Sequence, residues 1–170
     1  CDAAAGHIYM DGKDYHSMKP EELRKHIAMV PQQVNLFSGT IRENLLLADP
    51  DADDQTLMEA VKEAGLLKFV QSLEKGLNSD IGNAGASLSG GQRQKMGIAR
   101  ALLSKAEYMI FDEATSSVDP ESEKEIWETI GHLAHTRTLI IISHRMSSVR
   151  GADCIYVLKD GRVAQQGDHE

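Results

Sequence analysis

A serine followed by two glycines stands where a helix is predicted to begin, and this arrangement suits the binding of an anion. The residues are Ser89, Gly90, Gly91 and Gln92. Backbone N–H groups in the first turn of a helix have no intrahelical acceptor, and the helix dipole adds positive potential there. Glycines let an anion approach the backbone closely. Taken alone, the same pattern also fits a glycine-rich loop whose serine caps the helix.

Two acidic residues, Asp112 and Glu113, follow the apolar run Tyr108–Phe111. Such a run predicts a buried strand, and its end would deliver both carboxylates to the edge of a parallel sheet, where ligands bind in open α/β folds. Asp112 is a candidate ligand of Mg²⁺, directly or through water. Glu113 is a candidate base that would orient and deprotonate an attacking water. Taken alone, the pair also fits an acidic turn after a strand.

A histidine, His144, comes just after a second apolar run, Leu139–Ile142. This run predicts another buried strand, and two neighbouring parallel strands would bring His144 near the two acids. Without those acids, His144 would be interpreted as a surface histidine. His132 and His135 lie inside a helical pattern without a further ligand, which is weak evidence for a metal site.

The elements that must position these residues alternate between short apolar runs and helical periodicity. The alternation predicts an α/β fold with a mostly parallel sheet covered on both faces. Strands are predicted at His7–Met10, Ile27–Val30, Tyr108–Phe111, Leu139–Ile142 and Ile155–Leu158, with Arg162–Gln165 as a hairpin partner. Helices are predicted at Pro20–His26, around Leu57–Ala64 with a capping box of Thr56 and Glu59, at Ser89–Leu103 and at Glu121–Ala134.

The order of three motifs resembles the ATPase domain of ABC transporters. The motifs are LSGGQ at Leu88–Gln92, MIFDEATSSVD at Met109–Asp119 and IIISHR at Ile140–Arg145. Gln32, after the second predicted strand, resembles the glutamine of the family's Q-loop, and Leu36–Asn44 resembles the exporter branch. The resemblance covers essentially the whole chain. It implies a P-loop NTPase (RecA-like) core, incomplete here, with an α-helical signature subdomain.

The resemblance also implies a division of the chain and a set of partners. Residues 1–37 and 104–170 would belong to the core, and residues 38–103 to the helical subdomain. The intact domain would pair head to tail with a second nucleotide-binding domain and would contact the transmembrane domains of an exporter. It would lie at the cytoplasmic face of the membrane and use Mg²⁺ with ATP.

Roles for individual residues follow from the same resemblance. Asp112 would end the Walker B motif and hold Mg²⁺, and Glu113 would be the catalytic base. Gln32 would sense Mg²⁺ and the attacking water, and His144 would be the switch histidine. The residues expected to contact the nucleotide of the opposite subunit are those of the signature motif and the D-loop: Ser89, Gly90, Gly91, Gln92 and Asp119.

The phosphate-binding pattern G-x-x-x-x-G-K-[ST] does not occur in the 170 residues. The pair Gly12-Lys13 is followed by Asp14, and His7 stands where the first glycine belongs. We therefore expect the chain by itself to bind MgATP negligibly and not to hydrolyse it. By the resemblance, this loop would precede Cys1, and both ends of the chain would be cut. Its strand would lie inside the sheet, so a fragment would be marginally stable, self-associated or rearranged.

The composition is typical of a globular domain and argues against a nucleic-acid-binding or membrane-spanning protein. Hydrophobic residues make up 41% and charged residues 26%, which is typical of a globular domain. A net charge of −8 and the lack of a basic run argue against nucleic acid as a partner. The longest strongly apolar run is far shorter than the roughly 20 residues of a membrane-spanning helix. Cys1 and Cys154 match no zinc or redox spacing.

Two other functions remain open at this point. One is a truncated module that acts only by association, which the missing phosphate-binding loop favours. The other is an ABC-type ATPase without a membrane partner, as in DNA repair or translation. The stretch Leu36–Asn44, the acidic balance and the lack of a long coiled-coil insertion favour the transporter.

Overall fold

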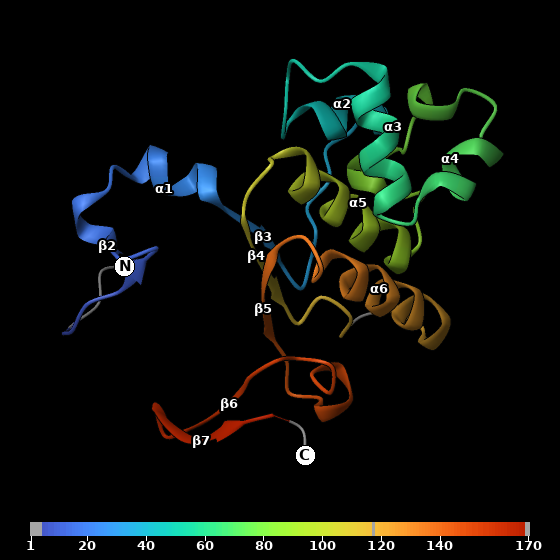
Figure 1. The fold of residues 1–170 in the computed structure, drawn as a ribbon. Coiled ribbons are helices and arrows are strands. Elements are labelled where there is room, and N and C mark those ends of the chain that lie inside the picture. Colours follow the sequence, from blue (N-terminus) through green and yellow to red (C-terminus); the bar gives the residue numbers. More distant parts are fainter. Residues whose placement is uncertain (1–4, 117, 169–170) are drawn as a thin grey trace.

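Three parallel strands form the sheet that carries the predicted site residues. The computed structural model describes residues 5–116 and 118–168. The strands lie side by side in the order β3-β4-β5 (Figure 1). Val30 pairs with Phe111 and Asp112 with Ile142, so the carboxyl ends of all three strands meet at one edge. The strands are Ile27–Val30 (β3), Tyr108–Asp112 (β4) and Thr138–Ile142 (β5).

One face of this sheet is buried against two long helices. Successive side chains of a strand point to opposite faces, and the side chains of Val30, Met109 and Phe111 on this face are fully buried. The helices are α5 (Gly90–Leu103) and α6 (Pro120–Leu133), which lie on the same side of the strands (Figure 1). Their buried residues join those of the strands in a single hydrophobic core.

Several short helices follow β3 in the sequence and pack around α5. α3 packs against α5, and its apolar residues Leu57, Ala60 and Val61 are buried. The helix begins earlier than the sequence predicts, because Asp53 accepts a hydrogen bond from the N–H of Thr56 and acts as the N-cap, so the predicted capping box of Thr56 and Glu59 is wrong. The elements are α2 (Ile41–Leu46), α3 (Asp54–Glu63), α4 (Leu67–Ser72), η2 (Gly76–Asn78) and η3 (Asn83–Gly85).

No described residue covers the opposite face of the sheet, so the prediction that helices cover both faces is wrong for the part of the chain that the structure describes. On this face Met29, Ile140 and Ile142 are 54%, 47% and 49% exposed. The predicted hairpin of Ile155–Leu158 with Arg162–Gln165 is confirmed, but it does not join the parallel sheet. In the described part of the chain, β6 (Ile155–Lys159) pairs with β7 (Arg162–Gly167) as a separate antiparallel hairpin. β5 is the last strand of the sheet, and no described strand pairs with its edge on the side away from β4.

The N-terminal segment forms a small unit beside the sheet (Figure 1). Its two short strands make a hairpin around a turn at Asp11-Gly12. The hydroxyl of Tyr108 donates a hydrogen bond of 2.6 Å to Asp11, which ties this unit to β4. The elements are β1 (Tyr9–Met10), β2 (Lys13–Asp14), η1 (Tyr15–Ser17) and α1 (Pro20–His26); η4 (Met146–Ser148) follows β5.

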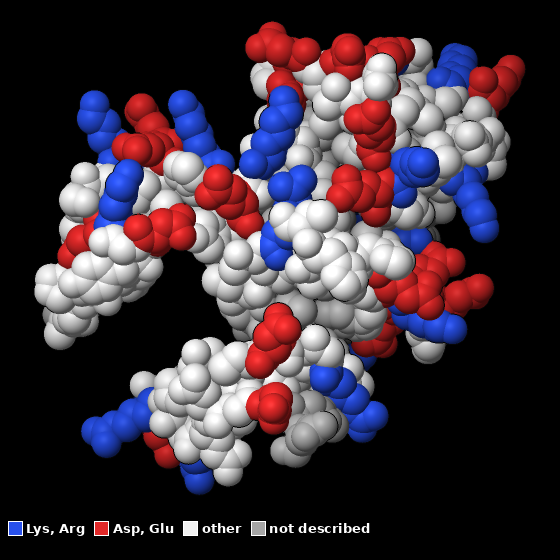
Figure 2. All heavy atoms as spheres, viewed as in Figure 1, with Lys and Arg blue, Asp and Glu red and all other residues white. Residues whose placement is uncertain are grey.

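Charged side chains of both signs are interspersed over the face seen in Figure 2. The same view shows a hollow between the N-terminal unit and the C-terminal hairpin, where the open face of the sheet lies. Among residues 5–116 and 118–168, no helix combines the length and the apolar character needed to cross a membrane.

Candidate active site at the carboxyl edge of the sheet

Four of the predicted site residues lie just beyond the carboxyl ends of the parallel strands. Gln32 follows β3, Asp112 ends β4, Glu113 follows it, and His144 follows β5. The backbone N–H of Glu113 donates to the carbonyl of Ile142, at 2.9 Å, so the ladder between β4 and β5 continues to this point. The edge at which these side chains gather is the usual ligand-binding edge of an open α/β sheet.

Glu113 and His144 are in direct contact. His144 Nδ1 lies 3.0 Å from Glu113 Oε1. Because an ionised carboxylate can only accept, the hydrogen of this bond belongs to the imidazole. Glu113 has a φ of 47°, a left-handed conformation that costs energy in a residue other than glycine and that is concentrated at functional sites. The sequence predicts that these two side chains meet, and the structure brings them together.

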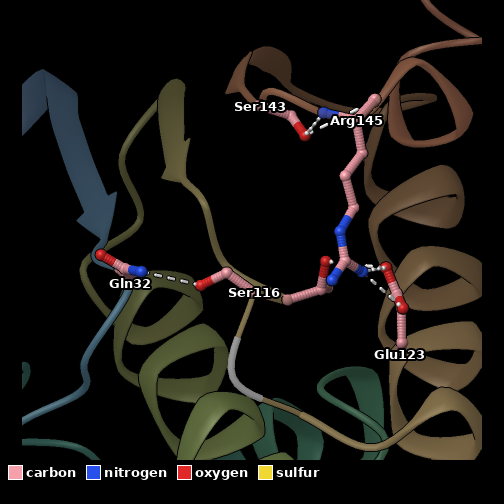
Figure 3. A network of polar contacts seen from close by, with 6 residues as sticks. Gln32, Ser116, Glu123, Ser143 and Arg145 are labelled. Atoms are coloured by element: carbon pink, nitrogen blue, oxygen red, sulfur yellow. Dashed lines mark hydrogen bonds and ion pairs between the residues drawn. The ribbon is translucent and has the colours of Figure 1, made fainter.

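Gln32 is held in place by a hydroxyl from the segment after β4. Its Nε2 donates a hydrogen bond of 2.9 Å to Ser116 Oγ (Figure 3). With the amide nitrogen engaged, the amide oxygen is left as the group that can bind a cation. Ser117, which belongs to the predicted D-loop, lies outside the described residues.

The oxygen atoms of Asp112 and Gln32 are suited to a Mg²⁺ ion that is bound together with a phosphate. Asp112 supplies a carboxylate and Gln32 an amide oxygen, and Mg²⁺ prefers oxygen ligands. No cluster of three or more His, Cys, Asp or Glu side chains suited to a metal ion occurs in the described ranges. Mg²⁺ is commonly held by one or two carboxylates plus phosphates of the substrate, and does not need such a cluster.

The crevice beside Glu113 and His144 is small. The crevice that Glu113, Trp127 and His144 line has a volume of about 10 Å³, the room of a single water. A larger hollow of about 330 Å³ lies beside Gln32 and is also lined by Gly90. A nucleotide at Glu113 would therefore have to bind largely on the open side of the cluster.

The predicted signature motif begins α5, and its polar side chains cap the helix. Ser89 Oγ accepts from the N–H of Gln92 at 3.2 Å, and Gln92 Oε1 accepts from the N–H of Ser89 at 2.9 Å. The structure thus confirms the serine as an N-cap. The cap leaves the N–H groups of Gly90 and Gly91, in the first turn, without an intrahelical acceptor.

A reason for Gly91 that the sequence analysis missed is the close approach of α6. A Cβ at this position would lie 2.5 Å from Ser122 Oγ and 2.6 Å from Ser122 Cβ. Side-chain atoms do not pack at such distances, so glycine is required for the two helices to meet here. Gly91 therefore has a packing role in addition to any contact with an anion.

Asp119 is the N-cap of α6. Its Oδ1 accepts a hydrogen bond of 2.9 Å from the N–H of Ser122. Hydrogen bonds from the backbone at Ser122 hold the pKa of the Asp119 carboxyl below its usual value. The predicted contact of Asp119 with a nucleotide in a second subunit stays a prediction.

Three further residues of the site were missed by sequence reasoning. Arg145 Nη1 lies 2.8 and 2.9 Å from the two carboxylate oxygens of Glu123 (Figure 3). Thr115 Oγ1 donates to Glu123 Oε1 at 3.2 Å. Partial burial by itself raises the pKa of the Glu123 carboxyl, but the hydrogen bonds from Arg145 and Thr115 hold that pKa below its usual value. No local pattern indicates that positions 123 and 145 meet, although Arg145 directly follows His144.

Comparisons with known proteins agree with this fold and with the family that the motifs resemble. The sequence model of a family described as ABC transporter matches residues 1–116. ABC-type transporter kk1G of Curvularia clavata is 43% identical over 171 residues, which cover 99% of this chain and 13% of that transporter. ATP-dependent lipid A-core flippase 1 of Colwellia psychrerythraea is 41% identical over 169 residues, which cover 99% of this chain and 28% of the flippase.

A solved structure is also similar. The structure of a bacterial Atm1-family ABC exporter with ATP bound matches with a TM-score of 0.90 at 36% identity, over 99% of this chain and 29% of the exporter chain. This chain thus spans less than a third of the length of each of these relatives. The resemblance predicted from the order of the motifs is confirmed, and the chain belongs to the ABC transporter family.

Proposed function

We propose that this chain forms part of the ATP-binding and ATP-hydrolysing domain of an ABC exporter and lies at the cytoplasmic face of a membrane. The observation that carries the proposal is the contact between His144 and Glu113 at the carboxyl edge of the parallel sheet. A carboxylate and an imidazole in contact, with an amide and a second carboxylate nearby, suit the hydrolysis of a phosphoanhydride.

Each residue of the cluster has a role in the proposed reaction. Glu113 accepts a proton from the water that attacks the γ-phosphorus, as the new O–P bond forms and the bond to the leaving ADP breaks. His144 donates to Glu113 and orients its carboxylate. Asp112 and the amide oxygen of Gln32 would hold Mg²⁺, which would neutralise part of the phosphate charge.

The other half of the site comes from a second nucleotide-binding domain. Its signature motif, at Ser89, Gly90, Gly91 and Gln92, would offer free N–H groups and a helix dipole to the γ-phosphate. Asp119 would contribute across the same interface. Residues 38–103 would form the helical subdomain that carries the signature motif, and residues 1–37 and 104–170 the core. The transmembrane domains of the exporter would contact the helical subdomain and the segment after Gln32.

We further propose that the 170 residues by themselves bind MgATP negligibly, because they contain no phosphate-binding loop. Such a loop supplies several charge-assisted hydrogen bonds, each worth about 1.5–3 kcal/mol. About 1.4 kcal/mol corresponds to a tenfold change in affinity, so the loss of several bonds weakens binding by orders of magnitude. Titration calorimetry on the 170-residue chain should give no measurable heat of binding at micromolar MgATP. A micromolar Kd would contradict this.

The test of the proposed function is ATP hydrolysis by the full-length protein that contains this chain. We expect steady hydrolysis by the wild type and a fall in kcat of about 10²–10⁴-fold in Glu113→Gln. Glu107→Gln is the matched control, because Glu107 is an exposed carboxylate at the opposite end of β4. A wild type without ATPase activity, or a fully active Glu113→Gln, would contradict the proposal.

A second candidate function is a module that acts only by association. The single observation in its favour is the lack of a phosphate-binding pattern in the 170 residues. This function predicts that the full-length protein does not hydrolyse ATP under any condition. An ABC-type ATPase without a membrane partner is a third candidate, and it predicts ATPase activity that does not change when the protein is placed in lipid.

A further inference from the structure

One ion pair joins the loop that carries His144 to the first turns of α6. The guanidinium of Arg145 contacts both carboxylate oxygens of Glu123, at 2.8 and 2.9 Å (Figure 3). Contact with both oxygens fixes the direction of the side chain more strictly than contact with one. Since Arg145 is the next residue after His144, holding its side chain also restrains the backbone that carries the imidazole.

The same carboxylate is connected to the opposite side of the site. Thr115 Oγ1 donates to Glu123 Oε1 at 3.2 Å. The neighbouring Ser116 accepts a hydrogen bond of 2.9 Å from Gln32 (Figure 3). The loops after β3, β4 and β5 are therefore linked through one short segment, at Thr115 and Ser116, and one carboxylate. These loops carry the residues proposed to act on the nucleotide.

The two residues of the ion pair lie on elements that differ in burial: Glu123 on α6 and Arg145 on the loop after β5. α6 is anchored in the core by Ile126, Ile130 and Leu133, which are buried. The loop after β5 is exposed, and the His144 side chain is 64% accessible. Glu123 is thus a fixed point against which an exposed loop is held.

We propose that Arg145 and Glu123 are positioning residues, whose ion pair holds His144 in hydrogen-bonding contact with Glu113. This inference rests on the proposed ATPase function. Ion pairs between partly exposed side chains contribute little to stability, so the pair acts mainly on orientation. A misplacement of about 1 Å in a catalytic group can cost about 10²-fold in rate, so its loss lowers kcat while nucleotide binding stays intact.

The first experiment compares two arginine–carboxylate ion pairs in the full-length protein. Arg145→Met and Glu123→Gln should each lower kcat about 10–100-fold, with the KM for ATP unchanged within about twofold. Arg145→Lys keeps a positive charge but places it on a flexible ammonium group, so it should retain an intermediate kcat. The control is Arg42→Met, which removes an ion pair of Arg42 with both oxygens of Asp54, at 2.5 and 2.9 Å, in the helical region. It should leave kcat unchanged.

The second experiment asks whether Arg145 acts through His144. In a double-mutant cycle, Arg145→Met should lower kcat in the wild-type background and have little further effect in His144→Ala. Independent, multiplicative losses would overturn the inference. So would a rise in KM without a change in kcat, because Arg145 would then contact the nucleotide directly.

The outcomes separate this inference from the proposed function. If the wild type hydrolyses ATP and Glu113→Gln does not, the proposed function stands. If Arg145→Met and Glu123→Gln then retain full kcat, the positioning role alone is wrong. If Arg42→Met lowers kcat as much as Arg145→Met, the effect is a general loss of structure and the inference is also wrong.

Discussion

The two faces of the three-stranded sheet differ in what covers them, although the same strands supply both. On the helix side Met109 and Phe111 are fully buried, whereas on the open side Met29 and Ile140 are about half exposed. Strands that are apolar on both faces are typical of parallel sheets with two covered faces. The difference indicates that the helix side supplies most of the stability of this chain.

The largest expected effect is on the buried face. Phe111→Ala should lower the free energy of unfolding of the chain by about 3–5 kcal/mol, because it leaves a cavity between β4 and the helices. Denaturant unfolding followed by circular dichroism measures this loss. Leu158→Ala, at a residue 72% exposed in the separate hairpin, is the control and should change stability by less than about 0.5 kcal/mol. Equal losses would contradict the comparison.

A smaller loss is expected where the two covering helices meet. Gly91→Ala should cost about 1–3 kcal/mol, since the added methyl overlaps Ser122 and forces α5 and α6 apart. Ser122→Gly in the same chain should recover part of the loss by removing the overlapping atoms. A stable Gly91→Ala chain with an unchanged melting temperature would show that the helices are not packed at this point.

Neighbouring isoleucines on β5 offer a matched comparison of the two faces. Ile141 packs against the core and Ile140 is exposed on the open face. Ile141→Thr should lower the free energy of unfolding by about 1–2 kcal/mol, because it buries a hydroxyl, and Ile140→Thr should change it by less than about 0.5 kcal/mol. Equal melting temperatures of the two variants of the 170-residue chain would contradict this difference between the faces.

The smallest effect is expected at the start of α6 and depends on pH. The backbone hydrogen bond at Ser122 lowers the pKa of Asp119 in the folded chain. Its charged form therefore stabilises the fold above the unfolded pKa of about 3.9, and this stabilisation is lost as the pH falls through the lower folded pKa. The gap in melting temperature between wild type and Asp119→Ala should be constant near neutral pH and shrink below about pH 4. A gap that widens in acid would contradict the sign.

The sequence predicts the site better than it predicts the surroundings of the sheet. β4 and β5 are runs of apolar residues followed by chemically distinctive side chains, so their pairing and the meeting of Glu113 with His144 follow from general rules for parallel sheets. Ser89 as the cap of α5 is a local signal of the same kind.

The parts that could not be predicted depend on contacts between distant residues. Whether β6 joins the sheet depends on what lies beside β5, and no pattern within β6 contains that information. The ion pair of Glu123 with Arg145 spans 22 positions and two elements. The approach of Ser122 to Gly91 likewise depends on how α5 and α6 pack.

The most direct test of the central claim is a double-mutant cycle between Glu113→Gln and His144→Ala, measured as single-turnover ATP hydrolysis by the full-length protein. If the two side chains act as one unit, each single variant loses most of the rate and the double variant is little slower than the worse single variant. Losses that multiply in the double variant, or full activity in either single variant, would contradict the account.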